Sequence, residues 1–170
     1  MKSLIIKNDE IDYELFEKIA AFLDKYDENE VLAIWLCSKG GDCSVTEAIR
    51  DLLESDERVV LIAYDMISSS ALDLFLSTNC AKTLTDGTIA CFHKSFYSNI
   101  KVLKDNRTPF FGRQEKLVGE VFRSEVDSDE HIKKFLSKEE LEDYEKGEDI
   151  WLNYQRLKEI YEEAAKPIPL

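Results

Sequence analysis

The sequence predicts an α/β fold with a mostly parallel sheet. Residues 31–37 (VLAIWLC) and 59–64 (VVLIAY) are apolar runs without alternation, which is typical of strands covered on both faces. A helical pattern separates the two runs, so the connection is a crossover and the two strands are parallel. At 170 residues the chain is expected to form one domain, 1–170, around one core.

Two helices are expected on either side of the first apolar strand. Residues 13–26 place apolar side chains at helical spacing, and Asp12 precedes them as an N-cap. The helix after the strand is expected to begin at Ser44, because Glu47 three residues later would complete a capping box. Both patterns leave one apolar face for burial against the sheet.

Beyond the second apolar strand, strands and helices continue to alternate. A buried helix is predicted from about Ala71 to about Thr78, because its large apolar residues lack a polar face. The remaining expected elements are strands near 82–84, 88–92 and 148–153, and helices near 114–124, 137–147 and 154–165.

Composition excludes several kinds of partner. With 22 basic and 35 acidic residues, the formal charge is −13, and a field of this sign repels phosphate backbones and anionic membranes. No apolar run approaches the roughly 20 residues of a membrane-spanning helix. We therefore expect a cytoplasmic protein that binds neither nucleic acid nor membrane.

The cysteines do not indicate a metal site. None of the four lies in a CxxC pair, and only His93 and His131 could add imidazole ligands. Two of them lie inside apolar runs and are expected to be small core residues. No metal or other cofactor is therefore expected. The four cysteines are Cys37, Cys43, Cys80 and Cys91.

Three segments contain residue types that could carry chemistry. Gly40 and Gly41 lie between a strand and a helix, where glycine can turn backbone N–H groups outward to hold an oxyanion or can simply form the turn. Residues 68–70 (SSS) open a buried helix, so these serines are either helix caps or a nucleophile at a helix N-terminus. His93 ends an apolar run, where an imidazole is either a general base or an ordinary polar residue.

Four motifs occur in a defined order along the chain: SKGGD at 38–42, ISSSA at 67–71, TIACFH at 88–93 and FLSKEELEDYEKGEDI at 135–150. In this order and spacing they resemble the Clp protease proteolytic subunit (ClpP) family, within the ClpP/crotonase-like superfamily. The resemblance covers about residues 5–152. It implies a spiral of repeated strand–helix units.

The resemblance also implies roles for individual residues. Ser69 corresponds to the nucleophile, with Ser68 as the runner-up, and His93 corresponds to the general base. The backbone N–H groups of Gly40 and Ser70 correspond to the oxyanion hole. The implied activity is that of a serine-type endopeptidase, which transfers an acyl group to serine and then hydrolyses it.

The third member of the family's triad is an aspartate, and its position here is Lys133. A lysine cannot accept the imidazole N–H. Asp127, Asp129 and Glu130 are the acidic residues that could replace it. Two further departures are Asp65, where the family has glycine, and Lys39, where it has proline.

The family resemblance implies a homo-oligomer that acts on a peptide or an unfolded protein. The segment between His93 and Phe135 is shorter than in the family, and the N-terminal segment lacks the family's axial gate, so neither stacked rings nor an unfoldase partner is expected. Two alternatives stay open: a catalytically degenerate binding or assembly protein with this fold, and a crotonase-type acyl-CoA enzyme.

Overall fold

The computed structural model describes residues 1–93 and 133–164, and the predicted helix at 114–124 lies outside them. Apart from β1, for which no range was predicted, and the longer β3, the described elements fall close to the predicted ranges. They are β1 (Lys2–Lys7), α1 (Tyr13–Asp24), β2 (Leu32–Ser38), α2 (Cys43–Glu54), β3 (Val59–Ser68), α3 (Ser70–Ser77), β4 (Ala81–Leu84), β5 (Ile89–Phe92), α7 (Lys138–Lys146), β6 (Ile150–Leu152) and α8 (Tyr154–Ala164).

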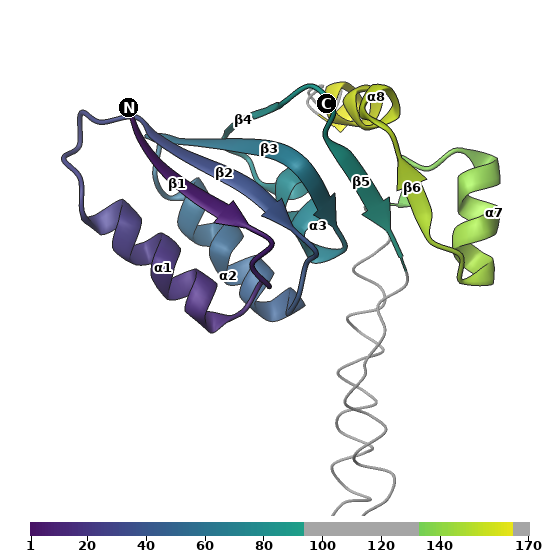
Figure 1. The fold of residues 1–170 in the computed structure, drawn as a ribbon, viewed down its shortest axis with the longest axis horizontal. Helices are drawn as coiled ribbons and strands as arrows, with labels where there is room; N and C mark the ends of the chain where they lie inside the picture. Colours follow the sequence, from purple (N-terminus) through teal and green to yellow (C-terminus); the bar gives the residue numbers. More distant parts are fainter. Residues whose placement is uncertain (94–132, 165–170) are drawn as a thin grey trace, which may run out of the picture.

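One six-stranded sheet organises the described part of the chain (Figure 1). The strand order is β1-β2-β3-β5-β6, and β4 pairs with the first half of β3. Every pair is parallel except β5 with β6, which is antiparallel. The predicted α/β class with a mostly parallel sheet is thus confirmed.

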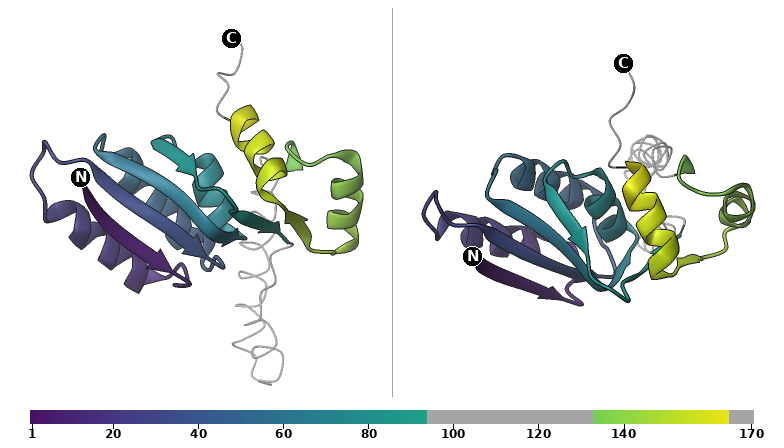
Figure 2. Two further views of the ribbon diagram at one scale, coloured as in Figure 1. Left: turned by 45° about the horizontal axis from the view of Figure 1, so that its top comes forward. Right: turned by 90° about the horizontal axis from the view of Figure 1, so that it is seen from above.

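The helices α1, α2 and α3 lie side by side on one face of the sheet (Figures 1 and 2). The fully buried side chains of this layer include Ile6, Ile34 and Leu61 from the three neighbouring strands. Ile5 points the other way and is 61% exposed. α8 packs against α3, β5 and β6. Among the described residues, no helix is both long and apolar enough to cross a bilayer.

β3 is longer than predicted, because a bulge carries it past Tyr64 to Ser68. Leu36 of β2 pairs with Ala63, whereas Ser38 pairs with Ile67, so extra β3 residues face β2 at this point. The first half of β3 pairs with β4, and the half beyond the bulge pairs with β5. The bulge therefore delivers the end of β3 to the end of β5.

Carboxylates cap the first two helices. Asp12 caps α1 as predicted, accepting the Leu15 N–H at 2.9 Å. The predicted capping box at Ser44 is wrong: α2 begins one residue earlier, and Asp42 is its N-cap. The Asp42 carboxylate accepts both the N–H and the hydroxyl of Ser44, at 2.8 and 2.6 Å. The hydroxyl bond, with the backbone N–H bonds, lowers the pKa of Asp42 against the opposing effect of burial.

An ion pair connects α7 to α8. Arg156 donates to both carboxylate oxygens of Glu140, at 3.0 and 2.7 Å, and to the Phe135 carbonyl at 2.9 Å. Glu140 also completes a capping box with Ser137. The bond from Arg156 is the largest cause that lowers the pKa of Glu140, to about 2.

We predict that Glu140→Gln destabilises the fold by about 1–3 kcal/mol at pH 7. The folded-state pKa of Glu140 lies below its ordinary value of 4.5. The stabilisation is therefore fully present above pH 4.5 and is lost as the pH falls towards 2. Urea unfolding of both proteins at pH 7, 4.5 and 3 should show the difference shrinking with acid.

The matched control is Glu142→Gln, on the same helix. Its side chain is 59% exposed and lies 3.9 Å from Lys138, so its loss should cost under about 0.5 kcal/mol. A Glu140→Gln deficit that is the same at all three pH values would show that the carboxylate charge does not stabilise the helix pair.

Candidate active site

The predicted site residues come from the carboxyl ends of adjacent parallel strands. The arrows of β2, β3 and β5 point to the same edge of the sheet (Figure 1). The Gly40–Gly41 turn follows β2, Ser69 follows β3 and His93 follows β5. This edge is where open α/β sheets usually bind their ligands.

Ser69 is joined directly to the end of β5. Its N–H donates to the Cys91 carbonyl at 3.0 Å, continuing the β3–β5 ladder in which Ser68 pairs with Cys91. His93 follows Cys91 by two residues. The candidate nucleophile and the candidate base therefore lie just beyond the ends of two paired strands. Both residues are half-buried.

The backbone of Ser69 is strained. Its φ of 54° and ψ of −131° belong to the first central position of a type II′ turn, where glycine is usual. Ser69 stands at the N-cap of α3, yet its side chain makes no capping hydrogen bond. The interpretation of this serine as a helix cap is therefore wrong. Strained backbone of this kind is concentrated at functional sites.

The two neighbouring serines are oriented inward. Ser68 is 8% exposed and is paired across the sheet with Cys91, whose thiol is buried and has a pKa raised mainly by that burial. Ser70 is 5% exposed, and its hydroxyl is bonded to Gly41. Burial disfavours the runner-up nucleophile Ser68. Ser69 is the one member of the triplet whose side chain is not buried.

Gly40 contacts the backbone around Ser69 so closely that no side chain fits. A Cβ on Gly40 would lie 2.8 Å from the Ser69 Cβ and 2.8 Å from the Ser68 carbonyl oxygen. The φ of Gly40 is also +94°, which disfavours any L side chain. A Cβ on Gly41 would overlap the backbone of Ile11. The turn therefore needs Gly40 to reach the end of β3 and Gly41 to pass the backbone of Ile11.

Two hydroxyl groups bond the N–H groups of this turn. The Gly40 N–H donates to Ser38 Oγ at 3.1 Å. The Gly41 N–H donates to Ser70 Oγ at 2.7 Å, and this hydroxyl donates to the Gly41 carbonyl at 3.2 Å. The structure thus ties the turn to the start of α3, but it commits the Gly40 N–H to Ser38.

The second predicted oxyanion donor is the backbone N–H of Ser70. Ser70 is the first residue of α3, so its N–H has no acceptor within the helix. It lies at the positive end of the helix dipole, which favours a negative charge.

Sequence analysis missed Ser38 as a residue of the site. A serine hydroxyl often bonds the backbone N–H two residues later, and Ser38 precedes Gly40 by two residues.

The positions where this chain departs from the family pattern have defined surroundings. Lys133 is half-buried, and its carbonyl accepts the Leu136 N–H at 3.1 Å, just before α7. Asp127 and Asp129 lie outside the described residues. Asp65 is exposed in the β3 bulge with a φ of 56°. Aspartate is one of the few residues other than glycine that enter this region readily.

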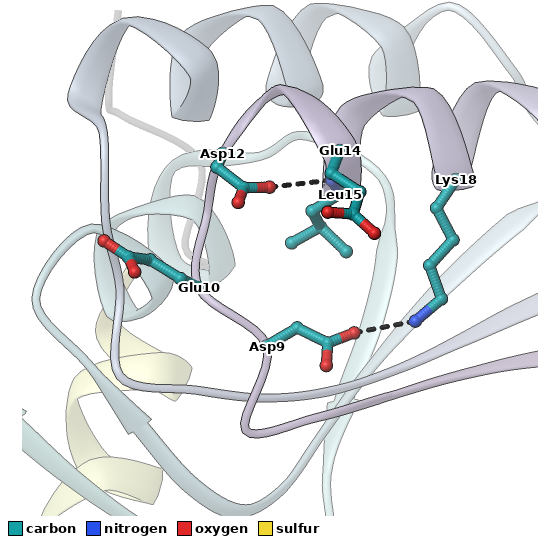
Figure 3. A pocket seen from close by; sticks show the side chains of 6 residues that line it. All are labelled: Asp9, Glu10, Asp12, Glu14, Leu15 and Lys18. Carbon is teal, nitrogen blue, oxygen red and sulfur yellow. Dashed lines mark hydrogen bonds and ion pairs between the residues drawn. The ribbon is translucent and has the colours of Figure 1, made fainter.

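An acidic pocket of about 250 Å³ lies beside the 9–12 loop (Figure 3). Ile11 of this loop is hydrogen-bonded to Gly40 and Asp42. Asp9 is paired with Lys18 at 2.7 Å, and Asp12 is used as the α1 cap. Within the described ranges, no group of three or more potential ligands could hold a metal ion. The pocket contains neither Ser69 nor His93. It is lined by Asp9, Glu10, Asp12, Glu14, Leu15 and Lys18.

Among solved structures, a ClpP1 mutant from Listeria monocytogenes resembles this chain, with 18% sequence identity and a TM-score of 0.56. The match covers 94% of this chain and 86% of the ClpP1 chain. The match confirms the predicted ClpP-like fold. At this sequence identity a structural likeness shows the fold alone. No protein-family model matches the sequence, and no curated protein does so either.

We predict that Gly40→Ala destabilises the protein more than Gly87→Ala. Gly87 has a similar φ of +83°, but no atom lies within 4 Å of the position that its Cβ would take, so its replacement costs only the strain of about 1–2 kcal/mol. Gly40→Ala adds a steric conflict of about 1–3 kcal/mol. Chemical denaturation of both variants measures the difference, and equal losses would contradict the close contact with Ser69.

Proposed function

We propose that this protein is a ClpP-like serine hydrolase that cleaves peptide bonds through Ser69 and His93. One observation carries the proposal: Ser69 holds a strained backbone at a helix N-terminus, while its hydroxyl does no capping. Strain of this kind costs of order 1–3 kcal/mol and persists only where surrounding contacts impose it. Gly40 and the Cys91 carbonyl supply those contacts.

The reaction would proceed by acyl transfer. The Ser69 oxygen bonds to the carbonyl carbon of the peptide while its proton passes to His93. The C–N bond then breaks, and the proton moves from His93 to the leaving amine. Water, deprotonated by the same imidazole, attacks the acyl-serine ester and releases the carboxylic acid with Ser69 restored.

The tetrahedral oxyanion would form next to the start of α3. The Ser70 N–H and the dipole of α3 favour negative charge at that point. The Gly40 N–H is the second donor once it leaves Ser38. Each such donor typically contributes about 10²–10³ in kcat.

Slow turnover is expected because this chain has a lysine at the position of the acidic third member of the family's triad. In a model serine protease, loss of the acidic partner of histidine lowers kcat by about 10⁴, because the imidazole takes the wrong tautomer. Lys133 occupies the family position of that partner, and a lysine cannot replace it as an acceptor. Asp127 and Asp129 stay candidates for this role.

The remaining expectations follow from the same fold likeness. We propose a cytoplasmic homo-oligomer with one domain per chain, no cofactor, and a peptide or an unfolded protein as substrate. The ClpP1 neighbour supports the shared fold.

A second candidate function is that of a binding or assembly protein without catalysis. It is favoured by the Ser38–Gly40 hydrogen bond, which occupies one oxyanion donor, and by Lys133 at the acidic position. This candidate predicts the same fold with an unreactive Ser69.

Labelling with a fluorophosphonate separates the two candidates. We predict one covalent adduct on Ser69, detected by intact-protein and peptide mass spectrometry. Ser69→Ala should abolish the adduct. His93→Gln should slow labelling at least about tenfold, because the base that activates the hydroxyl is lost.

Ser77→Ala is the matched control, since Ser77 lies on the same helix and its hydroxyl donates to the Asp73 carbonyl at 2.7 Å. It should label like the parent protein. Absence of any adduct on folded protein, under conditions that label an active serine hydrolase, would contradict the hydrolase proposal. Loss of the adduct in Ser68→Ala alone would assign the nucleophile to Ser68.

A further inference from the structure

We propose that Ser38 is a positioning residue that closes the candidate oxyanion site in the resting protein. This inference rests on the proposed function, because it assigns the Gly40 N–H to the oxyanion. It adds that the Gly40 N–H stays bonded to the Ser38 hydroxyl until a substrate takes the place of that hydroxyl.

The Ser38 hydroxyl is fully buried and bonded on both sides. It donates to the Asp9 carbonyl at 2.7 Å and accepts from the Gly40 N–H at 3.1 Å. A hydroxyl has one hydrogen, and here that hydrogen is directed to Asp9. Its lone pairs are therefore the part that faces Gly40, and the bond from Gly40 has a fixed direction.

The neighbouring peptide group is held on both sides and cannot turn as easily. The Gly40 carbonyl accepts the Ile11 N–H at 3.0 Å, and the Gly41 N–H donates to Ser70 Oγ at 2.7 Å. Rotating the peptide between Lys39 and Gly40 breaks the bond to Ser38 and leaves both of these intact. Glycine tolerates the necessary change of backbone angles.

A substrate would favour the open arrangement. The oxyanion that forms on attack is a charged acceptor, and hydrogen bonds to charged groups are about twice as strong as those to a neutral hydroxyl. Opening the site costs one neutral hydrogen bond, which corresponds to a few-fold to about tenfold reduction in reactivity. Removing the Ser38 hydroxyl should recover that factor.

The first test measures the Gly40 amide directly by hydrogen exchange. Among the six glycines, only Gly40 and Gly147 follow a lysine. Carbonyl-labelled lysine combined with ¹⁵N-glycine therefore leaves two amide signals. We expect exchange at Gly40 to be at least about tenfold faster in Ser38→Ala than in the parent. The Gly147 amide, which donates to the Tyr144 carbonyl at 3.0 Å, is the internal control and should not change.

The second test measures the rate of fluorophosphonate labelling at Ser69. Ser38→Ala should label a few-fold to about tenfold faster than the parent, a direction that simple loss of structure would not produce. Thr78→Val removes another fully buried hydroxyl, one that donates to the Leu74 carbonyl, and should leave the rate unchanged. If Ser38→Ala does not fold, Ser38→Cys tests the same point, because a thiol is a weaker acceptor.

The two tests separate the inference from the proposed function. Unchanged Gly40 exchange in a folded Ser38 variant would overturn the inference. Where the parent protein labels, a variant labelling rate that is equal to or slower than the parent rate would overturn it as well. If neither protein labels but Gly40 exchange still accelerates, the bond to Ser38 is established and the hydrolase proposal fails.

Discussion

The contact between Gly40 and the backbone of Ser68–Ser70 is the constraint on which the site depends. It exists because position 40 lacks a Cβ, and a Cβ there would lie 2.8 Å from that of Ser69. The parallel register and the β3 bulge bring the two turns to one edge of the sheet. Ser69 is held in its strained conformation between this contact and its bond to β5.

Much of the fold could be predicted because its signals are local. The run at 31–37 lacks alternation, and Asp12 stands before a helical pattern, so β2 and α1 follow from burial and capping alone. The start of α2 was misplaced because the Asp42 carboxylate accepts the Ser44 N–H, which the predicted capping box would have given to Glu47.

The site could be predicted only by position. Serine does not favour positive φ as glycine does, so the conformation of Ser69 comes from tertiary contacts. The bond from Gly41 to Ser70 joins residues 29 apart in sequence, and no local pattern indicates it. The bond from Gly40 to Ser38 spans two residues, and a turn motif could have indicated it.

The central claim is that Ser69 reacts and that its oxyanion takes the N–H groups of Ser70 and Gly40. A crystal structure of the protein after treatment with a peptidyl phosphonate tests this most directly. We predict phosphorus bonded to Ser69 Oγ, the phosphoryl oxygen within hydrogen-bonding distance of both N–H groups, and Gly40 released from Ser38. An unmodified Ser69, or a phosphoryl oxygen that contacts neither N–H group, would contradict the account.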